Sequence, residues 1–272
     1  MEILDSFRTD KFPHIWCSGC GHGIVMGALV RAMNKLDLDH DKTVIVSGIG
    51  CSSRATGYLN FDTLHTTHGR ALAFATGIKF SEPELDVIVI TGDGDCTAIG
   101  GNHLIHAARR NINITTIMFN NSIYGMTSGQ YSPLTPQKAK ATTAPYGNIE
   151  PNFDPCELVQ GAGATYVARG TAYHIKKLTR FIKRGIEHNG FSFIDAVSQC
   201  PTNFGRKNGF KSAVEMMQWQ KENTITIERA AKASEKEVKN KILVGELHHN
   251  NRPEYTAKYE QVIEKAQKGG DN

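Results

Sequence analysis

The chain has 272 residues and a formal net charge of +4, with 31 Lys or Arg and 27 Asp or Glu. Hydrophobic residues make up 40% of it and charged residues 21%, which is ordinary for a globular protein and excludes a disordered, collagen-like or coiled-coil chain. The small basic excess forms no Lys/Arg block, so nucleic acid is not expected as a partner.

The predicted elements alternate between helices and strands along the chain. Apolar residues at helical spacing over residues 21–37 predict the first helix, and the β-branched run Lys42–Ser47 predicts the first strand. Leu85–Thr91 is almost wholly apolar, as expected of a strand covered on both faces of a parallel sheet. The remaining strands are expected at Asn113–Phe119, Thr165–Arg169 and Phe191–Val197, and the remaining helices at His68–Lys79, Asn102–Arg110 and His174–His188. This order predicts an α/β fold with a doubly wound, mostly parallel sheet.

Three segments lie outside this alternation. Residues 122–153 are rich in Pro, Gly, Ser and Thr and predict a long ordered loop, of the kind that often has a function. Residues 211–241 predict an amphipathic, highly charged helical stretch, and residues 242–272 a tail whose last five residues are frayed. We therefore place a first domain at residues 1–210 and a C-terminal helical and tail extension at residues 211–272.

The sequence gives no sign of membrane attachment or secretion. No apolar run reaches the ~18–20 residues of a membrane-spanning helix. The first residues, Met1–Asp5, lack the basic start and apolar stretch of a secretory signal. We therefore expect a cytoplasmic protein without a membrane partner. In that compartment the six cysteines are expected to be metal ligands or free thiols, not a disulfide framework.

Glycines and oxygen ligands follow two of the predicted strands. Gly92-Asp93-Gly94-Asp95 ends one of them, where glycines allow a phosphate to approach the backbone and a carboxylate holds a hard cation. Ile99-Gly100-Gly101-Asn102 opens a helix whose N–H groups face an anion. The next strand ends at Asn120-Asn121, so Asp93, the Asn121 side chain and the Ile123 carbonyl are candidate Mg²⁺ ligands. The alternative is two ordinary strand–turn–helix junctions. The spacing resembles the thiamine diphosphate (TPP) motif, in which the Asp and the second Asn bind Mg²⁺.

Four cysteines form a second candidate group. Cys17 and Cys20 stand in a Cys-x-x-Cys pair, Cys51 follows a glycine turn, and Cys200 precedes a proline. Four thiolates suit either an iron–sulfur cluster or structural Zn²⁺, and the residues alone leave both open. A redox-active Cys-x-x-Cys would give Cys51 and Cys200 no role. The two other cysteines, Cys96 and Cys156, are expected to be small buried hydrophobic residues.

Together these segments resemble the β subunit of 2-oxoacid:ferredoxin oxidoreductases, most closely the 2-oxoglutarate enzymes. The matching runs are Trp16–Gly23, Gly48–Ser53, His68–Arg70, Gly92–Asp95, Ile99–His103, Asn120–Tyr124, Gly125–Thr135 and Cys200–Arg206. The resemblance implies a sheet of the TPP-binding type and makes residues 1–210 a domain that binds TPP and an iron–sulfur cluster. It turns the choice for Cys17, Cys20, Cys51 and Cys200 towards a 4Fe–4S cluster.

The resemblance also implies the reaction and its residues. TPP would act as the electron sink in the oxidative decarboxylation of 2-oxoglutarate, with CoA taking the acyl group as succinyl-CoA and electrons passing through the cluster to ferredoxin. His68 would be catalytic. The cofactor-binding residues would be Gly50, Cys51, Ser52, His68, Gly92, Asp93, Gly94, Asp95, Asn102, Asn121, Ile123, Gly125, Met126 and Thr127, with Asp93, Asn121 and Ile123 on Mg²⁺. His22 is a candidate for a bond to the cluster or the aminopyrimidine.

Partners and rival functions follow from the same resemblance. The family draws the Glu that contacts the aminopyrimidine from an α subunit, and this chain shows no obvious candidate for it, so an αβ complex or a dimer of αβ is expected. No CoA-binding signature is visible. The first alternative is the same chemistry on pyruvate or another 2-oxoacid. The second is a non-redox TPP decarboxylase with structural zinc, and the third is a non-catalytic scaffold.

Overall fold

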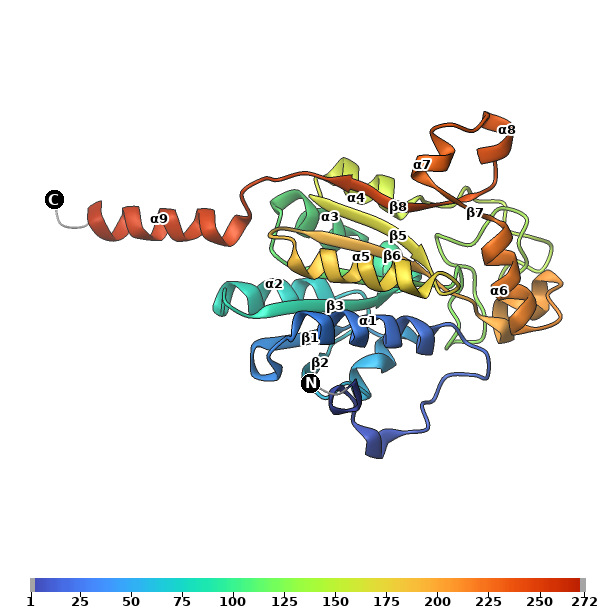
Figure 1. Ribbon diagram of the computed structural model, residues 1–272, viewed down its shortest axis with the longest axis horizontal. Coiled ribbons are helices and arrows are strands. Elements are labelled where there is room, and N and C mark those ends of the chain that lie inside the picture. The colour runs from blue at the N-terminus through green and yellow to red at the C-terminus, as the bar shows by residue number, and fades with distance from the viewer. Residues whose placement is uncertain (1–2, 270–272) are drawn as a thin grey trace.

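A computed structural model of the chain describes residues 3–269. Its centre is an eight-stranded sheet with the order β2-β1-β3-β4-β6-β5-β8-β7 (Figure 1). The strands are β1 (Thr43–Ser47), β2 (Asp62–His65), β3 (Asp86–Gly92), β4 (Thr115–Asn120), β5 (Tyr166–Thr171), β6 (Ser192–Val197), β7 (Thr224–Thr226) and β8 (Ile242–His249). Strands β1 to β6 pair in parallel, whereas β8 runs antiparallel to β5.

Helices cover both faces of the sheet, which confirms the predicted doubly wound α/β fold. On one face lie α1 (His22–Leu36) and α5 (Ile175–Glu187), and on the other α2 (Ala71–Ser81), α3 (Gly101–Arg110) and α4 (Pro155–Ala162). The apolar run of β3 serves both layers because side chains alternate along a strand. Ile88 and Ile90 pack into the α1/α5 core, and Val87 and Val89 pack into the α2–α4 core.

The turn before α2 differs from the prediction and matters for the site. The helix expected from His68 begins at Ala71 instead. Gly69 has φ +71°, a left-handed conformation that a continuing right-handed helix does not contain. His68 and Arg70 therefore lie in a turn at the carboxyl edge of the sheet rather than on the helix.

Strand β2 and helix α4 were not predicted. Strand β2 is a short edge strand whose side chains are mostly exposed, so its sequence lacks the hydrophobic pattern that would predict a strand. Helix α4 does have start signals in its sequence. Asp154 caps it by accepting from Cys156 N at 2.9 Å, and Pro155 occupies the first turn, where a missing N–H costs nothing.

The structure of residues 211–269 differs from two predictions. The helical stretch expected over 211–241 is broken into α6 (Ala213–Glu222), β7, α7 (Ile227–Ala230) and α8 (Glu235–Val238). The tail expected over 242–272 instead contains β8 and α9 (Tyr255–Gly269). The run Ile242–Val244 gives β8 its strand character, and pairing with β5 covers an edge that would otherwise be open. The domain boundary at residue 210 stays a prediction.

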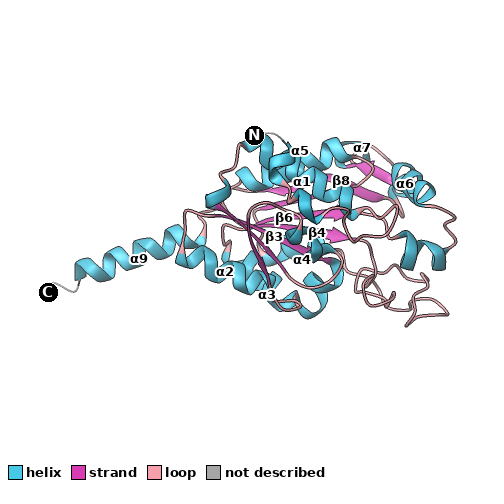
Figure 2. Cartoon of the chain, turned by 90° about the horizontal axis from the view of Figure 1, so that it is seen from below, coloured by secondary structure: helices cyan, strands magenta, loops and turns pink. Residues whose placement is uncertain are grey.

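Figures 1 and 2 show α9 projecting from the body, and Figure 2 shows the long irregular segments gathered at the opposite end. Residues 122–153 form no helix or strand, as predicted for the long loop. The fraying predicted for the last five residues falls partly on residues 270–272, outside the described range, whereas Lys268 and Gly269 belong to α9. Among the described residues, none of the helices combines the length and apolar character needed to cross a membrane.

Candidate cofactor site

A cavity of about 170 Å³ lies where β1, β3 and β4 end. Ligands of open α/β sheets bind at this carboxyl edge. The predicted residues that line it are Gly50, Cys51, Ser52, His68, Gly92, Asp93, Gly94, Asp95, Asn121, Ile123, Gly125, Met126 and Thr127. Four further lining residues were not among the predicted cofactor ligands: His22, Ile49, Phe119 and Tyr124. Asn102 is exposed on α3, and the structure does not bring it to the cavity.

Three oxygen atoms converge at the Asp93 side of this cavity. The Asn121 amide oxygen faces the Ile123 carbonyl oxygen at 2.7 Å and Asp93 Oδ1 at 3.2 Å. Without a cation, turning the amide would let its nitrogen donate to both oxygens. With a cation between them, the same three oxygens become ligands, and a carboxylate, an amide and a carbonyl are the oxygen donors that Mg²⁺ takes in proteins. The donor set therefore fits the predicted cation.

Burial shapes the chemistry of Asp93. Its side chain is buried, and desolvation raises its pKa to about 7, against a hydrogen bond from Ser132 that lowers it. A buried carboxylate is costly unless it is paired or bound to a metal. A divalent cation at Oδ1 would supply the missing positive charge. Within residues 3–269 no three His, Cys, Asp or Glu side chains, the four predicted cysteine ligands included, are arranged as a metal-binding group, so this candidate Mg²⁺ site depends on the amide and carbonyl oxygens.

His22 lies behind the oxygen cluster. Complete burial lowers its pKa to about 4, so its ring is neutral near pH 7. Its Nε2 lies 3.4 Å from Asn121 Nδ2, and its Nδ1 lies 3.3 Å from Ser198 Oγ. A neutral ring whose Nδ1 donates to Ser198 has Nε2 free to accept from the Asn121 amide nitrogen. That contact favours the amide orientation with oxygen towards Asp93.

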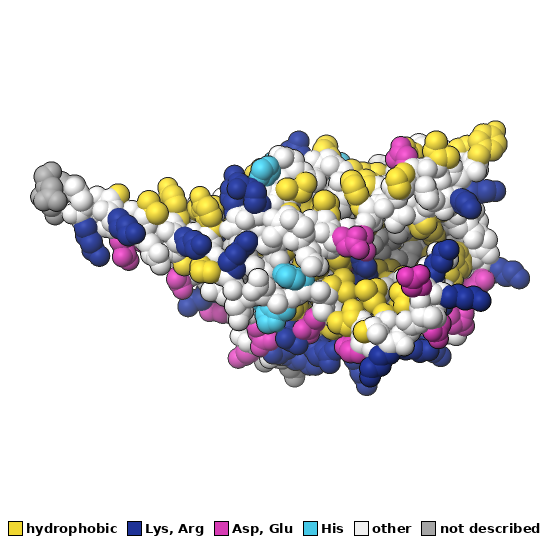
Figure 3. Space-filling view, turned by 90° about the horizontal axis from the view of Figure 1, so that it is seen from above, with side chains coloured by type: hydrophobic (Ala, Val, Ile, Leu, Met, Phe, Trp, Pro, Cys, Tyr) yellow, Lys and Arg dark blue, Asp and Glu magenta, His cyan; other side chains and the backbone are white. Residues whose placement is uncertain are grey.

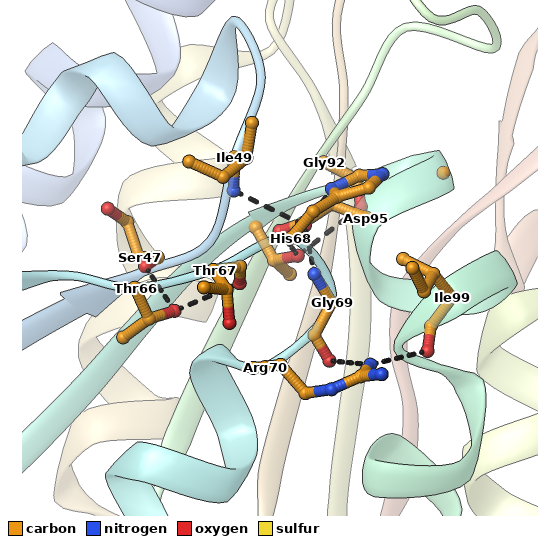
Figure 4. A network of polar contacts seen from close by, with 12 residues as sticks. Ser47, Ile49, Thr66, Thr67, His68, Gly69, Arg70, Gly92, Asp95 and Ile99 are labelled. Atoms are coloured by element: carbon orange, nitrogen blue, oxygen red, sulfur yellow. Dashed lines mark hydrogen bonds and ion pairs between the residues drawn. The ribbon is translucent and has the colours of Figure 1, made fainter.

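Asp95 lines the cavity and also joins the surrounding turns by hydrogen bonds (Figure 4). Its Oδ1 accepts from Gly69 N at 2.7 Å and Ile49 N at 3.3 Å, and it lies 2.6 Å from His68 Nδ1. Its Oδ2 accepts from the Thr91 hydroxyl at 2.7 Å. One carboxylate thus joins the turns that follow β1, β2 and β3. These four protein donors occupy both of its oxygens, and contact of Asp95 with the cofactor stays a prediction.

His68 is oriented by this carboxylate. Hydrogen bonding at Nδ1 places the proton of the neutral ring on that atom and leaves Nε2 as the acceptor. The ring is partly exposed, and it lines the cavity beside Tyr124 at a centroid distance of 6.2 Å. An oriented imidazole with one open nitrogen can hold or move a proton at Nε2. The geometry therefore suits the catalytic role predicted for His68.

The cavity floor matches a bound anion. Ser52 Oγ is buried and has no hydrogen-bond partner in the structure. Such a hydroxyl needs an acceptor, and a diphosphate oxygen is a suitable one. Gly94 leaves no space for a side chain, because a Cβ there would lie 2.2 Å from the Tyr124 ring. These two features fit the predicted diphosphate loop.

The four predicted cysteine ligands border the same region. A Cβ on Gly125 would lie 3.4 Å from Cys51 Sγ and 3.8 Å from Cys200 Sγ, so both sulfurs face this glycine. Gly21 N donates to Gln199 O at 3.0 Å, which brings the loop carrying Cys17 and Cys20 beside Cys200. Cys17 is exposed and Cys20 is partly buried.

Burial disfavours the thiolate form of these sulfurs, so ligation would need a bound group that stabilises thiolates. Burial raises the pKa of Cys20 to about 12 and that of Cys51 to about 11, and the neighbouring cysteines add to both shifts. Burial also raises the pKa of Cys200, although the backbone N–H groups of residues 202–204 lower it. N–H groups aimed at a sulfur are what a cluster-ligating thiolate needs. Cys96 and Cys156 are buried, as predicted.

A larger cavity of about 500 Å³ lies between the long loop, α6 and the start of β8. Figure 3 shows hydrophobic side chains inside a hollow on one face of the molecule. Of the predicted site residues, only Asn121 lines this larger cavity. Its buried charges are already paired, because Arg169 Nε donates to Asp195 Oδ2 at 2.7 Å and Asn120 Nδ2 donates to Asp195 Oδ1 at 3.0 Å. The chemistry-bearing residues therefore belong to the smaller cavity.

Comparisons with known proteins match this geometry. A family model described as "Thiamine pyrophosphate enzyme, C-terminal TPP binding domain" matches residues 48–196. The chain is 54% identical over 261 residues to 2-oxoglutarate synthase subunit KorB of Methanothermobacter marburgensis, covering 96% of this chain and 92% of the relative. It is 53% identical over 262 residues to the protein of the same name from Methanocaldococcus jannaschii, covering 96% and 97%.

A solved structure is similar over nearly the whole chain. It is described as 2-oxoglutarate:ferredoxin oxidoreductase from Magnetococcus marinus with 2-oxoglutarate, coenzyme A and succinyl-CoA bound. The TM-score is 0.88 at 34% sequence identity, covering 98% of this chain and 91% of that chain.

Proposed function

Because the chain belongs to the family of 2-oxoacid:ferredoxin oxidoreductase β subunits, we propose that it takes part in the oxidative decarboxylation of 2-oxoglutarate to succinyl-CoA and CO₂. It carries a TPP-binding domain and acts in an oxidoreductase with other subunits. The observation that carries the proposal is the convergence of the Asp93, Asn121 and Ile123 oxygens in a cavity that Cys51 also lines. One wall of this cavity would therefore belong to the diphosphate and another to the cysteine group.

In the proposed site, each of these residues has a separate role towards the cofactor. Bound TPP supplies an electron sink for the carbanion that loss of CO₂ creates. Asp93, Asn121 and Ile123 would hold Mg²⁺, and Ser52 would donate to the diphosphate. His68, oriented by Asp95, would hold or move a proton near the reacting atoms through Nε2.

The four cysteines would carry the electrons away. We assign Cys17, Cys20, Cys51 and Cys200 as ligands of a 4Fe–4S cluster that passes electrons to ferredoxin. Cys51 lines the TPP cavity, so this assignment puts the electron acceptor next to the site of chemistry. The zinc alternative uses the same sulfurs but offers no route for electrons, and it does not suit a family of ferredoxin-linked oxidoreductases.

The proposed substrate and partners are supported by the names of the relatives and of the similar structure. Proteins named for 2-oxoglutarate are 53% and 54% identical to this chain over the aligned residues, which supports 2-oxoglutarate over pyruvate or another 2-oxoacid. The similar solved structure holds 2-oxoglutarate, coenzyme A and succinyl-CoA, which supports CoA as the acyl acceptor. No Glu of the described residues lines the cavity, in keeping with an α subunit that supplies one. The cytoplasmic location stays a prediction.

The decisive experiment is an anaerobic absorption spectrum with iron, sulfide and zinc counted on the same sample. The proposal predicts a broad shoulder near ~400 nm that bleaches with dithionite, and about four irons per chain. Turnover of 2-oxoglutarate and pyruvate would then be compared in the complex with the α subunit. A colourless protein with one zinc would overturn the electron-transfer role. Preferential turnover of pyruvate would overturn the substrate assignment.

A further inference from the structure

The long loop over residues 122–153 reaches back to the strand end that carries Asp93. Ser132, at 1% exposed, donates its hydroxyl proton to Asp93 Oδ2. An ionised carboxylate can only accept, so the Ser132 hydroxyl is the donor, and the Ser132 oxygen in turn accepts from Leu134 N at 3.3 Å. We infer that Ser132 is a positioning residue for the cation site, because it holds Oδ2 and leaves Oδ1 facing the Asn121 amide oxygen, which in turn faces the Ile123 carbonyl oxygen.

The turn that presents Ser132 is also tied to the other metal-binding strand end. Thr135 closes the turn, with its N–H donating to Ser132 O at 3.0 Å and its Oγ1 accepting from Ser132 N at 2.8 Å. The Thr135 hydroxyl donates to Ser122 O at 2.6 Å, and Ser122 directly follows Asn121. One buried turn therefore fixes Asp93 at the end of β3 and the Asn121 segment at the end of β4.

The rest of the loop stabilises the turn formed by Ser132 and Thr135. Asn148 is buried, and its side-chain nitrogen donates to Thr135 O at 2.8 Å. The positions of the cation ligands thus depend on order far along the loop. Hydrogen bonds to a metal-binding carboxylate fix its orientation before the metal arrives, and losing such a partner typically lowers metal affinity about 10–100-fold.

The test measures metal binding directly, with Mn²⁺ in place of Mg²⁺. The inference rests on the proposed function, so the wild-type chain in complex with its α subunit is titrated first, with TPP present. Free Mn²⁺ is followed by electron paramagnetic resonance, a signal that does not depend on turnover. Ser132→Ala removes the donor, and Ser132→Cys fills nearly the same space with a weak donor. Thr142→Ala is the matched control, because Thr142 is an exposed residue of the same loop whose hydroxyl donates to Ser128 O and not to Asp93.

We expect both Ser132 variants to bind Mn²⁺ about 10–100-fold more weakly, and Thr142→Ala to match the wild type. If either folded Ser132 variant binds Mn²⁺ within about twofold of the wild type while its melting temperature falls, Ser132 is merely structural and the inference is overturned. If the wild type itself binds no Mn²⁺ with TPP, the proposed cofactor site is overturned instead.

Discussion

The hydrogen bonds to Asp95 carry a measurable share of stability, and Asp95→Asn isolates it. Asn keeps the shape and leaves one oxygen to accept from His68, Gly69 and Ile49, but it removes the charge. Hydrogen bonds to a charged group contribute about 1.5–3 kcal/mol, and neutral ones about 0.5–1.5 kcal/mol. A loss of roughly 1 kcal/mol at each donor predicts a total loss of about 3 kcal/mol.

Thermal unfolding of the cofactor-free protein checks this value. For a chain of this size each kcal/mol shifts the melting temperature by roughly 2 °C, so Asp95→Asn should melt about 6 °C lower. Thr91→Val removes a single donor to the same carboxylate and should show a smaller shift in the same direction. In the complex, turnover should fall as well, because His68 loses the charge that orients it. A melting temperature within about 1 °C of the wild type would refute the reasoning.

Three further outcomes test the site and the stability of the fold. Asp93→Ala should abolish Mg²⁺-dependent TPP binding with the fold retained, as measured by calorimetric titration; unchanged affinity would refute the metal assignment. Cys51→Ser should lose or convert the iron–sulfur cluster, whereas Cys96→Ser, which changes a buried thiol outside the proposed ligand set, should keep a full iron and sulfide count; an intact cluster in Cys51→Ser would remove Cys51 from that set. Burial and the adjacent His249 lower the pKa of His188 to about 4, so the folded state prefers the neutral ring and loses stability as pH falls below the unfolded value of about 6.5. The ring is only half-buried, so we expect His188→Gln to recover about 1 kcal/mol at about pH 5 and little at about pH 8 in urea unfolding; an equal effect at both pH values would contradict this.

Local patterns were sufficient to predict most of the sheet. Strands such as β3 are almost wholly apolar because both faces are covered, and that pattern is visible in any short window. Local sequence patterns did not predict elements that form because of tertiary contacts. Strand β8 has only the short apolar run Ile242–Val244 as a local signal, and its remaining residues form a strand because β5 offers an open edge, which no short window of sequence reveals.

The candidate site shows the same division. Asp93, Asn121 and Ser52 follow strands or glycine turns, so strand ends in the sequence were enough to propose them. Ser132 is separated from Asp93 by 39 positions and sits in a loop with many hydroxyl residues. Only the folded chain distinguishes the one hydroxyl that reaches the carboxylate. Tyr124 was missed for a similar reason, since its ring reaches the cavity by packing over Gly94.

The two acids of the Gly-Asp-Gly-Asp run show why residue type alone does not assign a metal ligand. Both side chains are buried, at 3% exposed each, and both follow the same strand. Asp95 meets four protein donors, so its charge is already compensated and neither oxygen is open. Asp93 receives the Ser132 hydroxyl at Oδ2, and the backbone N–H groups of Asp93 and Asn121 also stabilise its charge. Its Oδ1 nevertheless lies 3.2 Å from the Asn121 amide oxygen, which is unfavourable unless a cation lies between them. The groups that face each carboxylate therefore decide between them. An amide oxygen faces Asp93 Oδ1, which favours a cation there, whereas protein donors meet both oxygens of Asp95, which supports the loops.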